Sequence, residues 1–155
     1  MTSPLARPVI LDTNIVLDVF VFDDAAAQPL REGLAAGALQ WLATPAMRDE
    51  LARVLAYPKI VPRLAFYGLD AQQVLAAFDR HAVVVDAAPR ADVACKDADD
   101  QKFIDLAVAR QALLLSKDRA VLCMAKRLVA RGARAQPAIK PVAENSPPGL
   151  SASTA

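Results

Sequence analysis

Short apolar runs alternate with longer segments of mixed polarity along most of the chain. Four runs have the length and composition of strands buried on both faces. They cover residues 9–11, 39–43, 82–85 and 113–115. The segments between them favour helices, and residues 87–97 favour a loop. The predicted helices cover residues 14–22, 25–36, 71–80, 99–111 and 118–131. Strands that alternate with helices predict an α/β protein with a parallel sheet covered on both faces.

Helix signals refine this pattern in the middle of the chain. Pro45 suits the first turn of a helix. The residues after it place an apolar face at helical spacing, formed by Met47, Leu51, Val54 and Leu55. Asp70 is a candidate N-cap for the helix at 71–80. Pro58 and Pro62 predict a break between these two helices.

Composition sets the domain organisation. The chain has 155 residues, of which 55% are hydrophobic, so one globular domain with a sizeable core is expected and a wholly disordered chain is excluded. We place this domain at residues 7–136. Residues 137–155 are dominated by Pro, Ala and Ser and predict a flexible C-terminal tail. The formal net charge is +1, so no strong overall charge indicates a partner.

The few cysteines, the polar N-terminal residues and the short apolar runs indicate a cytoplasmic protein. Cys95 and Cys123 are too few for a disulfide scaffold, and with His81 as the single histidine they are too few for a zinc site. Residues 1–8 lack the apolar segment of a signal peptide. No apolar run reaches the length of a membrane span.

Acidic residues follow the predicted strands or border the neighbouring helices. Asp12 comes directly after the first strand, and Asp118 follows the fourth after two intervening residues. Asp100 lies in the first turn of the helix that leads to the fourth strand, and Glu50 borders the apolar face of the helix that starts at residue 45. Because ligands bind beyond the carboxyl ends of parallel strands, these carboxylates can converge on one crevice.

Several carboxylates in one crevice stay ionised only if a cation neutralises them. An all-oxygen donor set without clustered His or Cys favours Mg²⁺ or Mn²⁺ over zinc. Such metals typically serve phosphate chemistry. The acidic residues therefore indicate a metal site for that chemistry.

Each acid also has an ordinary structural interpretation. An Asp after a strand often forms a turn or caps a helix, which applies to Asp12. One of Asp97 and Asp99 is the natural N-cap of the following helix, and Glu50 can pair with Arg53.

Other conspicuous residues have interpretations of the same kind. Asp105 can pair with Lys102 or support the site. His81 is expected at a helix end, and Trp41 and Phe103 are expected in the core or the site wall.

Four segments, in order, resemble the motifs of the PIN domain nucleases over about residues 7–136. They are the run Ile10-Leu11-Asp12-Thr13-Asn14, the segment from Glu50 to Lys59, the run Asp97 to Phe103 with Ala107 a helical turn on, and Ser116-Lys117-Asp118-Arg119. Each motif is weak alone, and their order at strand ends makes the resemblance specific. Within this family, the chain is most similar to the toxins of toxin–antitoxin pairs.

The resemblance implies a three-layer α/β/α sandwich with a central parallel sheet. It also implies an endoribonuclease, a hydrolase of phosphodiesters that cleaves single-stranded RNA with Mg²⁺ or Mn²⁺. Carried over by motif, the metal-binding and catalytic acids are Asp12, Glu50, Asp100 and Asp118. Supporting positions are Thr13, Asn14 and Ser116, with Asp97 and Asp99 as outer acids.

One position departs from the family pattern. Relatives often carry a further acid two residues after the Asp118 position, where this chain has Ala120. The number of metals stays open for that reason. The departure also supports an alternative, a catalytically inactive PIN-like module that binds RNA or protein.

Partners are indicated by local sequence. A basic stretch that includes Lys117, Arg119, Lys126 and Arg127 can hold an RNA backbone or form a solvated helix face. A toxin would be blocked by a small antitoxin protein, and the apolar stretch 15–22 can pair two copies of the chain.

Two other α/β classes with acids at strand ends fit less well. A phospho-receiver domain pairs two acids after its first strand, and a haloacid-type phosphatase has a second Asp in its motif. Here only Asp12 follows that strand, before Thr13 and Asn14.

Overall fold

The computed structural model describes residues 6–139. Five strands in this part of the chain form one all-parallel sheet. They are β1 (Arg7–Leu11), β2 (Leu39–Ala43), β3 (Val83–Val84), β4 (Leu113–Leu115) and β5 (Arg134–Gln136). Their order across the sheet is β3-β2-β1-β4-β5, with β1 at the centre.

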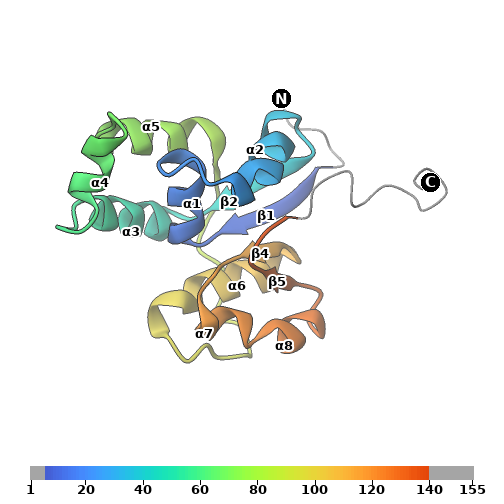
Figure 1. The fold of residues 1–155 in the computed structure, drawn as a ribbon. Coiled ribbons are helices and arrows are strands. Elements are labelled where there is room, and N and C mark those ends of the chain that lie inside the picture. Colours follow the sequence, from blue (N-terminus) through green and yellow to red (C-terminus); the bar gives the residue numbers. More distant parts are fainter. Residues whose placement is uncertain (1–5, 140–155) are drawn as a thin grey trace.

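Helices flank the sheet. They are α1 (Thr13–Phe20), α2 (Gln28–Ala35), α3 (Pro45–Leu55), α4 (Val61–Phe66), α5 (Ala71–His81), α6 (Gln101–Arg110), α7 (Arg119–Leu122) and α8 (Ala125–Val129). Two 3₁₀ turns, η1 (Ala25–Ala27) and η2 (Ala98–Asp100), lead into α2 and α6. Figure 1 shows α1 to α5 on one side of β1 and α6 to α8 on the other. The predicted α/β/α architecture with a central parallel sheet is confirmed.

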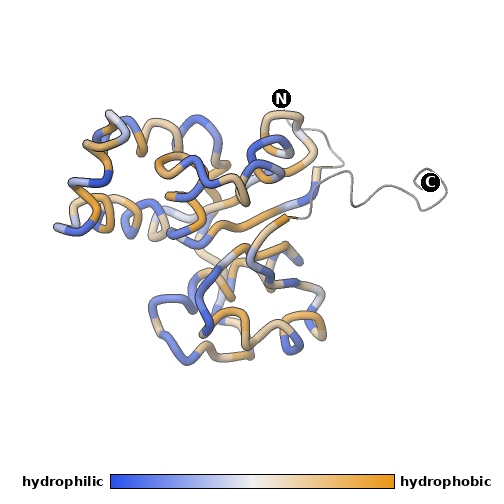
Figure 2. The backbone as a smooth tube through the Cα atoms, in the orientation of Figure 1, coloured by the Kyte–Doolittle hydropathy of each residue, from blue (hydrophilic) through white to orange (hydrophobic). Residues whose placement is uncertain are grey.

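The central strands are apolar because helices cover both of their faces. Val9, Ile10 and Leu11 of β1 are buried, as are all three leucines of β4. Figure 2 shows hydrophobic colour along β1, whereas hydrophobic and hydrophilic colours alternate along the helices. Trp41 and Phe103 lie in this core, as expected. Burial on both faces explains why these strands have no alternating pattern.

Four elements differ from the sequence prediction. The strand expected at 82–85 is shortened to β3 at the edge of the sheet, where Val83 and Val84 are exposed and not buried on both faces. The short edge strand β5 was not predicted, because it is partly polar and is held by backbone pairing with β4. Helix α4 lies where Pro58 and Pro62 indicated a break, and Pro62 stands in its first turn, where a missing N–H costs nothing. The helix expected at 118–131 is two short helices with a change of direction at Cys123 and Met124.

Helix ends follow the predicted capping chemistry in part. The Asp70 side chain accepts a hydrogen bond from the amide of Gln73, which completes a capping box at α5. The segments expected as single helices at 25–36 and 99–111 each begin with a 3₁₀ turn. His81 ends α5 and stacks on Phe20, as expected of a residue at a helix end.

Two predictions concerned surfaces and ends of the chain. Ile15, Val16, Leu17, Val19 and Val21 are buried in the core, so the stretch 15–22 is not a free face for pairing two copies, and that choice of interface is wrong. The predicted tail lies outside the described residues, except for residues 137–139, where Ile139 packs against the core.

Among the described helices, none is long and apolar enough to cross a membrane.

Candidate functional site

The carboxyl ends of β1 and β4 meet at one edge of the sheet. The two strands are parallel neighbours with Leu11 opposite Leu115, and the amide of Asp12 donates to the carbonyl of Leu115 at 3.0 Å. The chain then enters α1 after β1 and passes through Ser116 and Asp118 into α7 after β4. Register alone therefore brings Asp12 beside the residues that follow β4.

A third acid reaches this edge from the start of α6. Helix α6 packs against β1 and β4, and Asp100 ends the 3₁₀ turn that leads into it. One carboxylate oxygen from each of Asp12, Asp100 and Asp118 lies within 4.8 Å of the others. These three residues are called the carboxylate cluster below.

Ser116 holds two members of the carboxylate cluster in place. Its buried hydroxyl donates to Oδ2 of Asp12 at 2.7 Å and accepts from the amide of Asp118 at 3.0 Å. The Asp118 side chain caps α7 by accepting from the amide of Ala120 at 2.9 Å. The cap orients one oxygen of Asp118, and the other oxygen is available as a ligand for a cation.

The electrostatics of the carboxylate cluster are unfavourable without a cation. Burial, the contact with Asp118 and the charge of Asp12 raise the pKa of Asp100 to about 8. The same contact lowers the pKa of Asp118. Burial also raises the pKa of Asp12, against the opposing hydrogen bond from Ser116. Close, buried carboxyl groups cannot all ionise cheaply, which is the reason for these directions.

Glu50 lies beside the carboxylate cluster with both of its oxygens engaged. Thr13 donates its hydroxyl to Oε2, and the Lys102 ammonium pairs with Oε1. Lys102 also donates to the carbonyl of Asp99. Glu50 therefore stands next to Asp12 as one half of an ion pair, and its negative charge contributes to the raised pKa of Asp12.

The other predicted acids lie outside the carboxylate cluster. Asp97 caps the 3₁₀ turn η2 by accepting from the amide of Asp99, as its capping interpretation expected, and the Asp99 side chain is exposed. Asn14 is exposed on the first turn of α1, two residues after Asp12.

The basic residues do not form one uniform surface. Lys117 forms an ion pair with the buried carboxylate of Asp18 on α1. Arg119, Lys126 and Arg127 are exposed on α7 and α8.

Two pairings expected from the sequence are wrong. Glu50 pairs with Lys102 rather than with Arg53, which lies one helical turn along α3. Asp105 accepts from the amide of Ala91 and from the Gln101 side chain, so it fastens the 87–97 loop instead of pairing with Lys102. Lys102 lies 52 residues from Glu50 along the chain, so no local pattern could indicate that contact.

The donors fit a hard divalent cation. The carboxylate cluster offers oxygen atoms only, which suits Mg²⁺ or Mn²⁺. Oδ2 of Asp100 is the one buried side-chain N or O atom without a hydrogen-bond partner among residues 6–139. A buried polar atom without a partner is costly, and a cation would satisfy it.

A parallel sheet with carboxylates at the exit of its central strands places a site for a divalent cation at one edge of the sheet. The family model of the PIN domain matches residues 8–120. The chain therefore belongs to the PIN domain family. PIN domains are generally nucleases and usually use divalent metals. A comparison with curated proteins finds no match.

Proposed function

We propose that this protein is a metal-dependent endoribonuclease that cleaves single-stranded RNA and acts as the toxin of a toxin–antitoxin pair. The observation that carries the proposal is the carboxylate cluster, with its partnerless oxygen on Asp100 and its place at the exits of β1 and β4. Membership of a nuclease family gives the reaction class. Single-stranded RNA, the toxin role and action in the cytoplasm come from the resemblance and composition described above.

Asp12, Asp100 and Asp118 would hold Mg²⁺ or Mn²⁺ in this proposal. When bound, such a cation stabilises charge on a phosphate and lowers the pKa of a water molecule. Ser116 keeps Asp12 and Asp118 oriented through its two hydrogen bonds. The carboxylates bind and orient in this scheme and do not themselves attack phosphorus.

Glu50, Thr13 and Lys102 would form an outer layer of the site. Lys102 pairs with Glu50 at the edge of an already acidic pocket, and Thr13 donates to its second oxygen. Glu50 adds negative potential near Asp12. On the substrate side, Asn14, Lys117, Arg119, Lys126 and Arg127 are the residues proposed to contact RNA.

The decisive experiment is cleavage of a labelled single-stranded RNA with Mn²⁺, Mg²⁺ or EDTA. Wild type, Asp12→Asn and the matched exposed control Asp86→Asn are purified in parallel. We expect metal-dependent cleavage by wild type and Asp86→Asn, and none by Asp12→Asn. Equal cleavage by all three proteins would indicate a contaminating nuclease and contradict the proposal.

Ala120 stands where relatives often carry an acid, and this difference supports one competing function, an inactive module that binds RNA or protein. A protein that binds Mn²⁺ by calorimetry, binds the RNA and never cuts it would be such a module. Metal-dependent turnover that is lost in Asp12→Asn would exclude it.

The toxin role has a separate test. Induced expression of wild type should arrest growth of the host, whereas Asp12→Asn should not. A small antitoxin is proposed to block the pocket with a basic side chain among the carboxylates. A short open reading frame that neighbours the gene and whose co-expression restores growth would encode that antitoxin. Growth arrest that is equal for both proteins would refute a toxin that acts through this site.

A further inference from the structure

A hollow of about 480 Å³ lies along α1 and is not used by the carboxylate cluster. Its lining residues are Asn14, Asp18, Phe22, Asp24, Arg63 and Lys117. Asn14 is two residues from Asp12, and Lys117 directly precedes Asp118. Two lining residues of the hollow are therefore neighbours of Asp12 and Asp118 along the chain.

Helix α1 sets the direction in which the hollow extends. Asn14 and Asp18 stand one turn apart, and Phe22 follows shortly after the helix ends at Phe20. With a rise of about 1.5 Å per residue, the wall from Asn14 to the end of α1 is roughly 9 Å long. A strand whose phosphate is at the carboxylate cluster would pass a neighbouring nucleotide along this wall.

The far end of the hollow contains a stacked pair. The guanidinium of Arg63, from α4, lies 3.8 Å from the centre of the Phe22 ring, and the Tyr67 ring lies 6.0 Å from Phe22 at a tilt of 51°. Arg63 is exposed and forms no ion pair in the part of the chain that the structure describes. The guanidinium carbon of Arg63 lies over the Phe22 ring, and an exposed planar guanidinium is the kind of surface on which bases stack.

The acids of the hollow are engaged within the protein. Asp18 is neutralised by Lys117, and Asp24 caps η1 by accepting from the amide of Ala26. Arg63 is therefore the positive group of this cavity without a carboxylate partner among residues 6–139. The two acids and two basic residues of the lining balance in formal charge, so what the hollow offers a ligand is the exposed guanidinium of Arg63 beside the aromatic ring of Phe22.

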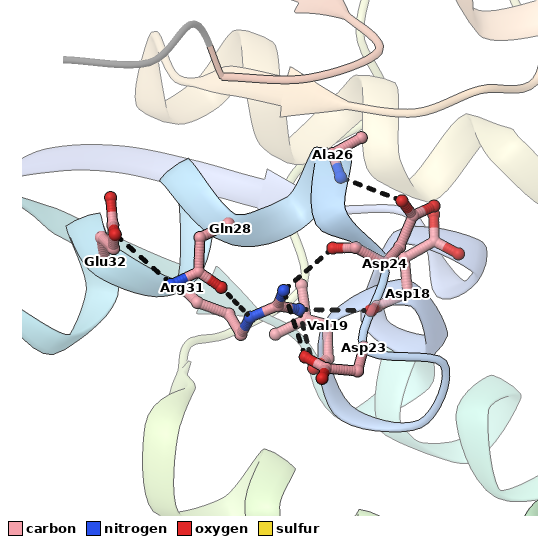
Figure 3. A network of polar contacts seen from close by, with 8 residues as sticks. All are labelled: Asp18, Val19, Asp23, Asp24, Ala26, Gln28, Arg31 and Glu32. Atoms are coloured by element: carbon pink, nitrogen blue, oxygen red, sulfur yellow. Dashed lines mark hydrogen bonds and ion pairs between the residues drawn. The ribbon is translucent and has the colours of Figure 1, made fainter. Parts of the chain in front are cut away.

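Arg31 holds the backbone of the loop that carries Phe22. Figure 3 shows its guanidinium directed into the turn after α1, where it donates to the carbonyls of Asp18, Val19 and Asp24 and pairs with Asp23. Asp23 has φ of 50°, in the left-handed region that non-glycine residues rarely adopt. A backbone held in this way supports a preorganised platform, because ordering a loop upon binding costs affinity.

We propose that this hollow is a nucleotide subsite, in which the base next to the scissile phosphate stacks on the Arg63–Phe22 pair. The proposal rests on the proposed function, since it takes the strand to be the substrate. It assigns Phe22 and Arg63, which no motif marks, to substrate binding. Asn14 and Lys117 connect the subsite to the carboxylate cluster.

The test measures binding of a short fluorescein-labelled single-stranded RNA in EDTA by anisotropy. Arg63→Gln and Phe22→Leu should each weaken binding about tenfold, within the range known for base stacking. Arg63→Lys should weaken it nearly as much, because an ammonium keeps the charge and loses the planar stack. The matched control Arg110→Gln, at the opposite end of α6 from Asp100, should stay within about twofold of wild type. Thermal melts of every variant verify folding.

A base-deletion series locates the stacked nucleotide. Removing one base at a time should weaken binding to wild type at one position, and the same deletion should cost nothing further in Phe22→Leu. Wild-type affinity in Arg63→Lys, or equal effects at every position, would overturn the subsite. Cleavage by wild type is measured separately, so loss of the proposed function and loss of the subsite give different results.

Discussion

Replacing Asp100 by Asn should stabilise the metal-free protein while it abolishes metal binding. Asp100 is 6% exposed, lies within the carboxylate cluster and has an oxygen without a hydrogen-bond partner. An amide of the same shape removes the charge and can donate to the neighbouring carboxylates. Without metal, the close carboxylates lower the stability of the folded protein. The substitution therefore raises the stability of the metal-free protein and removes a group needed for metal binding.

The pH dependence follows from the raised pKa of Asp100. It is about 8 in the folded chain, against about 3.9 for an unfolded Asp. Between these pH values the folded state holds the extra proton, so stability falls as pH rises, by at most about 1.4 kcal/mol per pH unit. The lowered pKa of Asp118 stabilises the fold at every pH above the unfolded value, and this stabilisation is lost only in more acidic solution, so Asp118 adds no pH dependence in this window.

We expect Asp100→Asn to be more stable than wild type by about 1–3 kcal/mol at about pH 7.5 in EDTA, because folded wild type must keep on Asp100 a proton that the unfolded chain releases at that pH, whereas the amide needs none. For a chain of this size, that raises the thermal midpoint by about 2–10 °C. The difference should shrink steadily as pH falls from about 8 towards about 4, because only near its own unfolded pKa does the unfolded Asp100 also bind the proton that the folded state holds.

Circular-dichroism melts with EDTA or Mn²⁺ provide the measurement. Mn²⁺ at about a hundred times its Kd should stabilise wild type by about 2.7 kcal/mol and should leave Asp100→Asn unchanged. The exposed control Asp86→Asn should follow wild type in every condition. A less stable Asp100→Asn protein in EDTA at about pH 7.5, or one that Mn²⁺ still stabilises fully, would refute the reasoning.

Three further substitutions test the groups around the carboxylate cluster and the loop after α1. Ser116→Ala removes a buried hydrogen bond to Asp12 and should cost about 2 kcal/mol, seen as a midpoint lower by about 4–8 °C; an unchanged midpoint would contradict that contact. Lys102→Met frees the charge of Glu50 and should tighten Mn²⁺ binding by roughly tenfold in calorimetry, whereas weaker binding would mean that Lys102 supports the metal site in another way. Arg31→Gln should speed hydrogen exchange at residues 22–27 and lower stability by about 1–2 kcal/mol, and unaltered exchange there would show that the loop is held by other contacts.

Local sequence was sufficient for much of the fold. The apolar runs of β1 and β4 follow from burial on both faces, and the face of Met47, Leu51 and Leu55 on α3 follows from helical spacing. Asp70 as a cap depends only on its own side chain and the next three residues. These features are local, so the order of residues determines them.

The elements that were missed depend on partners distant in the chain. The strand β5 exists because its backbone pairs with β4, whatever its side chains. At α4, Pro62 is equally compatible with a break and with a first helical turn, and the packing of the buried Leu64 is consistent with the second outcome. Tertiary contacts decide between such alternatives because local propensities differ by little.

The sequence by itself determined the family motifs, the acids at strand ends and the oxygen-only character of the site. Only the tertiary structure decided which acids meet: the β1–β4 register and the packing of α6 bring Asp12, Asp100 and Asp118 together, while Glu50 is paired with Lys102. It likewise placed Arg63 on Phe22, from segments 41 residues apart. The physical reason is that electrostatic and stacking energies depend on distance in space, which the spacing of residues along a chain does not specify.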